Sequence, residues 1–180
     1  MKHRWVIKRW LNWWRRLWHV PFLANIRRNH ALEHATIHLL STRLPGVRLA
    51  GRSTSRGFYI YGDVPTHLLE STVREAMHRL QAGEHQLALH PHCGTNLATA
   101  SVLTGLATAL SVMGPRRRWW DKLLTALGTA LAALTLAQPL GYWVQEHVTT
   151  EAQLPPGDIV HIRQFRWRNL TVHFVRMRYT

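Results

Sequence analysis

The pentapeptide His30-Ala31-Leu32-Glu33-His34 has the residue types and the spacing of a metal-binding helix. On an α-helix, residues four apart lie on one face, so His30 and His34 can present two imidazole nitrogens to the same ion. Glu33 precedes the second histidine by one residue and projects close to the same point. Two histidine ligands beside a carboxylate predict a metal centre at which Glu33 activates a water molecule.

A second cluster of ligand-type side chains, His90, His92 and Cys93, lies just before an uncharged segment. Two histidines from a helix and a cysteine from a loop supply the donors of a tetrahedral nitrogen and sulfur site. Cys93 is the single cysteine of the chain, so no internal disulfide competes for its thiol. We therefore expect His30, His34 and Cys93 to bind the metal, with His90 as the candidate fourth ligand.

The number of ligands separates two functions that the sequence leaves open. With three protein ligands, the fourth position is open to water and Glu33 serves as general base, as in a metallohydrolase. With His90 also bound, the site is closed and the metal is structural. Zinc is the default ion for histidine and cysteine donors, and iron, copper and nickel are the alternatives.

The leading hypothesis is a membrane-associated, zinc-dependent hydrolase whose substrate the sequence does not reveal. Residues 30–34 have the H-x-x-E-H order of inverted zinc peptidases, in which two histidines bind zinc and the glutamate activates water. A peptidase-like activity on peptide or lipid at the bilayer surface would fit this order. The alternative is a non-enzymatic membrane scaffold or complex subunit with a structural zinc site.

The elements that must position these residues follow from periodicity and from turn residues. A helix over 25–43 carries the histidine motif and ends at Leu44-Pro45-Gly46. The remaining elements before residue 96 are expected in this order: strands at 47–49 and 58–61 around a polar turn at 52–57, a helix capped by Asp63, and a strand at 85–89.

Two segments, 95–114 and 123–145, contain no charged residue. Each is long enough to cross a bilayer, which needs roughly 20 mostly apolar residues in a helix. The turn between them combines arginines with two tryptophans, the composition of a membrane–water interface. These features predict a transmembrane helical hairpin over 97–147, and a buried hairpin of a soluble protein is the alternative.

Basic and aromatic residues dominate both ends of a chain whose formal net charge is +14. Residues 1–21 form a tryptophan-rich pattern with basic residues on the other side, typical of a helix that lies in the headgroup layer. Residues 157–180 alternate apolar and basic side chains on both sides of Arg168-Asn169. This alternation predicts a C-terminal β-hairpin that packs on the metal-binding domain.

Together these features predict an α+β fold, in which a small mixed domain at 26–96 receives an inserted transmembrane hairpin and follows an amphipathic interfacial helix. The positive charge predicts an anionic lipid surface as a partner. A protein complex is a second candidate partner, and nucleic acid is disfavoured. We expect the bacterial inner (cytoplasmic) membrane, with the main domain in the cytoplasm, where anionic lipid would attract the N-terminal helix.

The two motifs together, H-x-x-E-H-x-T-I at 30–37 and H-P-x-C-G-T at 90–95, resemble those of YqhQ-like bacterial membrane proteins. They are still more similar to a related group of small domain-of-unknown-function membrane proteins from photosynthetic bacteria. The resemblance covers residues 29–96, implies that the membrane hairpin is real, and supplies no reaction. It also implies that one site contains these five residues: His30, Glu33, His34, His90 and Cys93.

Overall fold

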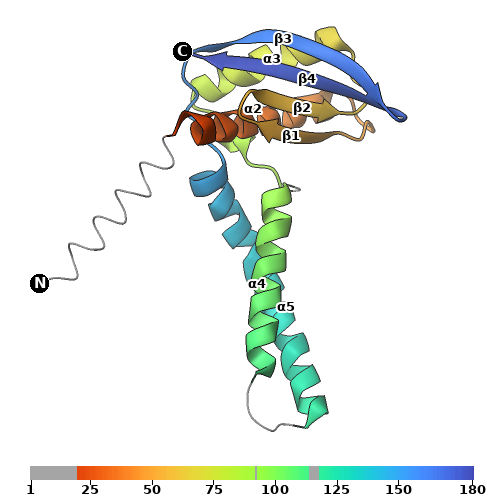
Figure 1. The fold of residues 1–180 in the computed structure, drawn as a ribbon, viewed down its shortest axis with the longest axis vertical. Helices are drawn as coiled ribbons and strands as arrows, with labels where there is room; N and C mark the ends of the chain where they lie inside the picture. The colour runs from red at the N-terminus through yellow and green to blue at the C-terminus, as the bar shows by residue number, and fades with distance from the viewer. Residues whose placement is uncertain (1–19, 92, 114–117) are drawn as a thin grey trace, which may run out of the picture. The chain divides into compact units, whose positions relative to one another are not determined.

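The structure is a computed structural model that describes residues 20–91, 93–113 and 118–180. The interfacial helix predicted at 1–21 lies almost entirely outside the described residues. The described residues fall into two compact units, unit 1 (residues 20–88 and 150–180) and unit 2 (the described residues of 89–149). Figure 1 labels the elements of both units, whose bounds follow below.

Unit 1 is built on a four-stranded antiparallel sheet with the strand order β1-β2-β4-β3. Its helices α2 and α3 cover one face of this sheet (Figure 1). The elements of unit 1 are α2 (Pro21–Arg43), β1 (Ala50–Thr54), β2 (Gly57–Tyr61), α3 (Thr66–Gln81), the 3₁₀ turn η1 (His85–Ala88), β3 (Gly157–Trp167) and β4 (Leu170–Tyr179).

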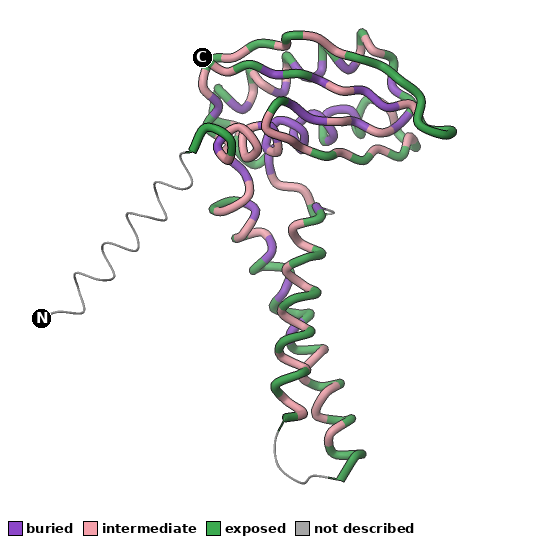
Figure 2. Tube along the Cα trace, viewed as in Figure 1, coloured by how far each residue is buried: buried purple, intermediate pink, exposed green. Residues whose placement is uncertain are grey.

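The core of unit 1 lies between the two helices and the sheet, as the buried residues of Figure 2 show. Side chains on a strand alternate between the two faces of the sheet. Phe58 and Ile60 of β2 and Val175 of β4 are therefore buried under the helices, and each is fully shielded from solvent. Helix α3 faces this core with an apolar stripe, whose buried members are Leu69, Val73, Ala76 and Leu80.

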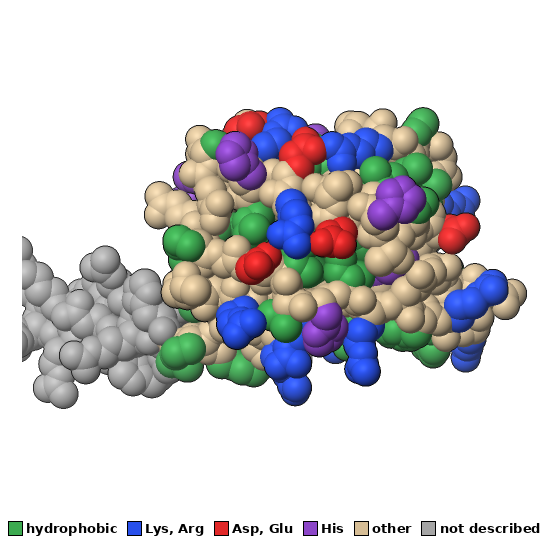
Figure 3. Space-filling view, turned by 90° about the horizontal axis from the view of Figure 1, so that it is seen from above, with side chains coloured by type: hydrophobic (Ala, Val, Ile, Leu, Met, Phe, Trp, Pro, Cys, Tyr) green, Lys and Arg blue, Asp and Glu red, His purple; other side chains and the backbone are tan. Residues whose placement is uncertain are grey.

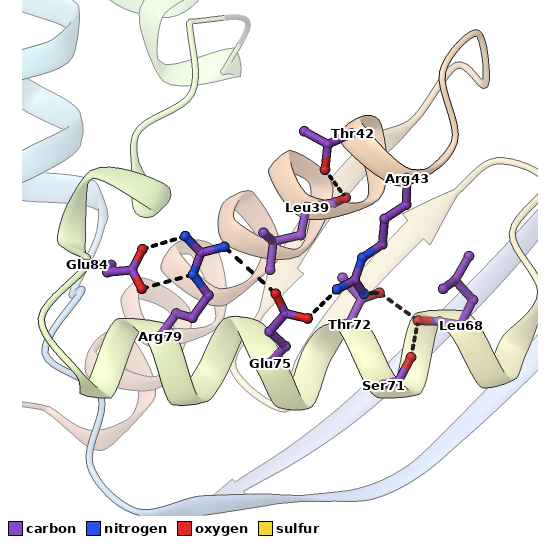
Figure 4. Close-up of polar contacts among 9 residues, drawn as sticks. All are labelled: Leu39, Thr42, Arg43, Leu68, Ser71, Thr72, Glu75, Arg79 and Glu84. Atoms are coloured by element: carbon purple, nitrogen blue, oxygen red, sulfur yellow. Dashed lines mark hydrogen bonds and ion pairs between the residues drawn. The ribbon is translucent and has the colours of Figure 1, made fainter.

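A chain of charged side chains links α2 to α3 and to the turn that follows α3 (Figure 4). Arg43 ends α2, donates to the Thr72 hydroxyl at 2.6 Å and pairs with Glu75. Arg79 donates from Nε to Glu84 at 2.9 Å, and this hydrogen bond lowers the pKa of the Glu84 carboxyl. Figure 3 shows acidic and basic side chains side by side on the surface of unit 1. Exposed pairs of this kind each contribute little to stability.

The first strand and its turn differ from the sequence prediction. The strand expected at 47–49 is wrong, because β1 begins at Ala50, and the polar turn expected at 52–57 contracts to Ser55 and Arg56. The reason lies in the hydroxyl of Ser53, which donates to Glu33 of α2 and so belongs to the strand. Thr54 still bonds within the shortened turn, where its Oγ1 donates to the Gly57 carbonyl at 2.9 Å.

Two further local predictions are wrong. The strand expected at 85–89 is the 3₁₀ turn η1, in which Leu87 and Ala88 are buried in the core instead of alternating along a strand. The expected helix cap Asp63 does not cap α3, which begins after Pro65 without a side-chain cap. The Asp63 carboxylate instead accepts a hydrogen bond from the Thr171 hydroxyl at 3.3 Å.

Unit 2 is a pair of long helices, α4 (Gly94–Val112) and α5 (Trp119–Val144), followed by the π-helical turn η2 (Gln145–Thr149). The helices coincide closely with the two uncharged segments, and both are long and apolar enough to cross a membrane. They come close together at Gly141, where a Cβ atom would lie 2.6 Å from Asn96 Oδ1. Two such helices suggest membrane association.

His173 of β4 is a buried histidine of unit 1. Its Nε2 lies 3.1 Å from the hydroxyl oxygen of Thr66, whose proton goes to Gln164 Oε1 at 3.0 Å. The Thr66 oxygen therefore accepts from Nε2–H, and Nδ1 has no partner among the described residues. Protonation would bury an unpaired N–H, and burial lowers the pKa of His173, while Asp63 opposes the shift.

We predict that unit 1 loses stability as the pH falls below about 6.5, the ordinary pKa of histidine. In that range the unfolded chain binds a proton that folded His173 does not, so the free energy of unfolding falls with the pH. Thermal midpoints of the detergent-purified chain from pH 7.5 to 5.5 measure this loss. His173→Gln should flatten the pH dependence and exposed His67→Gln should not. An equal slope in His173→Gln and the unmutated protein would contradict the assignment.

Candidate metal centre

Helix α2 carries the two histidines of the predicted site in unit 1. The His30 and His34 rings lie with their centroids 4.3 Å apart and their planes at 64°. This proximity follows from the four-residue spacing on one helix face. His34 is only 4% exposed and His30 is half-buried. The two rings are therefore in contact on one face of α2, with a ligand nitrogen of each within 4.8 Å of the other.

The tautomer of His34 is set by a backbone carbonyl. His34 Nδ1 lies 2.7 Å from the carbonyl oxygen of Ala88, in the turn η1. A carbonyl oxygen only accepts hydrogen bonds, so Nδ1 carries the proton and Nε2 carries the lone pair. A hydrogen bond of this kind orients a histidine that ligates a metal through its other nitrogen. The turn η1, which the sequence predicts as a strand, thus orients the ring of the candidate ligand His34.

Glu33 is buried between α2 and the edge strand β1, with 4% of its surface exposed. The Ser53 hydroxyl donates a hydrogen bond to its Oε2. Gly51, two residues earlier on the same face of β1, provides the space for the carboxylate, since a Cβ there would lie 2.1 Å from Glu33 Oε1. Neither Gly51 nor Ser53 belongs to the site predicted from the sequence. Their two-residue spacing, which places both on one face of a strand, was the available signal.

A buried asparagine fixes α2 against the sheet one helical turn before the motif. Asn29 Nδ2 donates to the Thr54 carbonyl at 2.8 Å, and Asn29 Oδ1 accepts from the Tyr179 hydroxyl at 2.8 Å. The pKa of Tyr179 is raised by burial, so the phenol keeps the proton that it donates. Because Asn29 reaches both β1 and β4, it sets the rotation of α2 and hence the direction of His30.

In unit 2, the predicted ligands His90 and Cys93 lie in the segment that leads into α4. Cys93 caps this helix, is 7% exposed, and its Sγ accepts the Thr95 N–H at 3.4 Å. The Gln145 side chain accepts from the His90 N–H and donates to the His90 carbonyl, each at 3.0 Å, and also donates to Asn96 Oδ1 at 2.6 Å. These bonds hold the backbone of the segment at the end of α5.

His30, His34 and Cys93 form a group that could hold a metal ion, each with one ligand atom. The expectation of a metal site with histidine and cysteine donors is therefore supported. The choice of zinc as the ion stays a prediction. Glu33 and His90 do not belong to this group. Their predicted roles, as general base and as fourth ligand, stay predictions.

We predict that Gly51→Ala destabilises unit 1 by about 1–3 kcal/mol, the usual cost of overpacking a filled interior. The new methyl group would occupy the place of the Glu33 carboxylate, which has to leave its buried position beside Ser53. Thermal unfolding of the purified chain measures the effect. The control is Ser55→Ala in the turn of the same hairpin, expected within about 0.5 kcal/mol of the unmutated protein. Because alanine is otherwise favoured over glycine in a strand, an unchanged or higher stability of Gly51→Ala would contradict this packing.

Comparison with known proteins places the chain in a family. Residues 25–162 match the model of a domain of unknown function, DUF6391. An uncharacterised protein of Picosynechococcus sp. is 35% identical over an alignment of 172 residues in length. The match covers 82% of this chain and 82% of that protein. No solved structure matches the chain. The expected membership of a family without an assigned function is thereby supported, whereas the resemblance to YqhQ-like proteins stays a prediction. Because the family model matches more than half of the sequence, the chain belongs to the DUF6391 family.

Proposed function

We propose that this protein is a membrane-attached, zinc-dependent hydrolase. In this proposal His30, His34 and Cys93 bind the ion and Glu33 serves as general base. The observation that carries the proposal is the three-donor group, together with a buried carboxylate on the same helix as its two histidines. Three protein ligands are the number found in catalytic zinc sites, which keep a fourth position for water.

The covalent chain supports the participation of Cys93. The Ala88 carbonyl is hydrogen-bonded to His34 within unit 1, and Cys93 follows Ala88 by five positions. An extended chain spans at most about 3.6 Å per residue, so the two Cα atoms lie within about 18 Å of each other in any arrangement of the units. The thiol is therefore tethered near His34 at a high effective concentration.

The donors fit zinc in particular. Two imidazole nitrogens and one thiolate are borderline to soft ligands, which zinc accepts in a tetrahedral arrangement. The position of Cys93 at the N-terminus of α4 favours the negative charge of a thiolate, because the helix dipole is positive there. Bound zinc would supply a water molecule whose pKa is about 7.

A general base at Glu33 has to be an ionised carboxylate. The hydrogen bond donated by Ser53 stabilises the ionised carboxylate, and only the ionised form can take a proton from water. Gly51 leaves the space in which this carboxylate sits. The roles of Ser53 and Gly51 are thus to position Glu33 and to keep it charged in a buried location.

A structural zinc site, in a scaffold or complex subunit, is the second candidate. It is favoured by the hydrogen bonds from Gln145, which fix the His90 backbone three positions before Cys93. If the His90 ring joined the other donors, the metal would have four protein ligands and no bound water. The two candidates therefore differ in one measurable property, the presence of an exchangeable ligand on the metal.

Membrane attachment rests on the surfaces of α4 and α5. Large apolar side chains along both helices are exposed, among them Leu106 at 60%, Leu110 at 69%, Leu124 at 68% and Leu131 at 66%. A soluble hairpin would leave this apolar area in water, whereas lipid would cover it. We propose that the two helices span the bacterial inner membrane, with unit 1 on the cytoplasmic side.

We predict about one zinc per chain in the detergent-purified protein, measured by elemental analysis. His34→Ala and Cys93→Ala should each lose most of the metal, because each removes a ligand. His38→Ala is the matched control, since His38 also lies on α2 but is exposed and outside the group, and it should keep the metal. Equal zinc content in His34→Ala and His38→Ala would refute the assigned ligands.

A cobalt-substituted protein separates the two candidates. For the hydrolase we expect the visible absorption of bound cobalt to change when azide is added, because azide replaces the open-site water. Glu33→Gln should retain the cobalt and its response to azide but abolish turnover of any substrate later found. If azide leaves the spectrum of the unmutated protein unchanged but alters that of His90→Ala, the site is closed and structural. This result would rule out the hydrolase.

A further inference from the structure

The sheet of unit 1 has a second face, opposite the helices, that carries aromatic side chains. Since Phe58 and Ile60 point into the core, Tyr59 and Tyr61 of β2 point to the opposite face. Phe174 of β4 pairs with Tyr59 and joins them, with ring centroids 4.7 Å apart. All three rings are half-buried, so the two central strands form an aromatic surface made of these rings.

Arginines border this aromatic surface on both edge strands. The strand register places Arg52 of β1 beside Tyr59, and Arg163 of β3 beside Phe174. One row across the sheet therefore reads Arg52, Tyr59, Phe174, Arg163, with both guanidinium side chains exposed. Arg176, two positions after Phe174 on the same face, is exposed as well. Cationic groups thus surround an apolar centre.

The tip of the β3–β4 hairpin extends the same face with more exposed apolar side chains. Phe165 is 45% exposed, Trp167 57% and Leu170 49%. The Arg168 guanidinium lies 5.7 Å from the centre of the Trp167 ring. Exposed tryptophan beside arginine is typical of residues placed at a membrane–water interface. Asp158, an acidic residue at the other end of the face, is paired with Arg74 of α3 at 3.1 Å.

We infer that this basic aromatic face, defined by Arg52, Tyr59, Arg163, Phe165, Trp167 and Phe174, binds the anionic headgroup surface of a lipid bilayer. Arginines complement phosphate charge, and amphipathic rings insert at headgroup depth. The inference rests on the proposed membrane attachment, since unit 1 joins unit 2 at two places, after residue 88 and before residue 150. If α4 and α5 span the bilayer, these links keep unit 1 within reach of its surface.

Charge alone would also fit single-stranded nucleic acid, whose bases stack on aromatic rings. The exposed Leu170 at the hairpin tip favours lipid, because an aliphatic side chain has no stacking role but does contribute to insertion at the interface. Binding of single-stranded nucleic acid to this face is the alternative that the experiment has to distinguish.

The test uses the full chain reconstituted into vesicles whose acyl chains carry bromine near the headgroup, which quenches tryptophan. Vesicles of phosphatidylcholine are compared with vesicles that also contain phosphatidylglycerol. The difference between the unmutated chain and Trp167→Phe isolates the emission of Trp167. We expect this emission to be quenched in the anionic vesicles, and the quenching to fall to the phosphatidylcholine level in Arg163→Glu. Arg48→Glu makes the same charge change at an exposed arginine outside the defined face and should leave the quenching intact.

Unquenched Trp167 in anionic vesicles, with quenching of the remaining tryptophans, would overturn the lipid face while leaving the membrane hairpin intact. A chain that does not float with either vesicle would instead overturn the membrane attachment on which the inference rests. Binding of an oligo-dT strand to the detergent-purified chain, weakened by Arg163→Glu but not by Arg48→Glu, would also overturn the inference and assign the face to nucleic acid.

Discussion

The burial of the Glu33 carboxylate between a helix and a sheet is the constraint on which unit 1 depends. A buried charge without hydrogen bonds costs several kcal/mol, so the surrounding chain has to supply both a donor and room. Ser53 supplies the donor and Gly51 supplies the room. Both lie on one face of β1, a strand that runs from Ala50 to Thr54 and closes on a two-residue turn.

The same constraint orients the candidate ligands. Once Glu33 faces β1, the helical geometry fixes the directions of His30 and His34, which occupy neighbouring positions of the motif. Asn29 reinforces this rotation through two strands that are far apart in sequence. The Ala88 carbonyl then selects the tautomer of His34. The protein therefore holds the histidine pair in position through its own packing, and an ion would add to an arrangement that already exists.

What the sequence could predict was set by the range of the interactions. The end of α2, the limits of α4 and the turn of the β3–β4 hairpin follow from local sequence signals and agree closely with the prediction, whereas α2 and α5 each begin four residues earlier than predicted. The role of Ser53 was not, because its partner Glu33 lies 20 positions away and the segment looks like a turn by itself. The turn η1 was misread for a similar reason, since it is shaped by burial under α2 and by a contact with His34 across 54 positions. His30, His34 and Cys93 can be chosen as candidate donors from the sequence, because histidine spacing and a lone cysteine are visible without any structure.

X-ray absorption at the metal edge of the purified, detergent-solubilised chain tests the central claim most directly. We expect zinc with one sulfur neighbour at about 2.3 Å and nitrogen neighbours at about 2.0–2.1 Å, the distances of cysteine and histidine ligands. Replacement of Cys93 by serine should remove the sulfur contribution. A metal surrounded only by nitrogen and oxygen, or a chain that binds no metal, would contradict the assignment of His30, His34 and Cys93 to one centre.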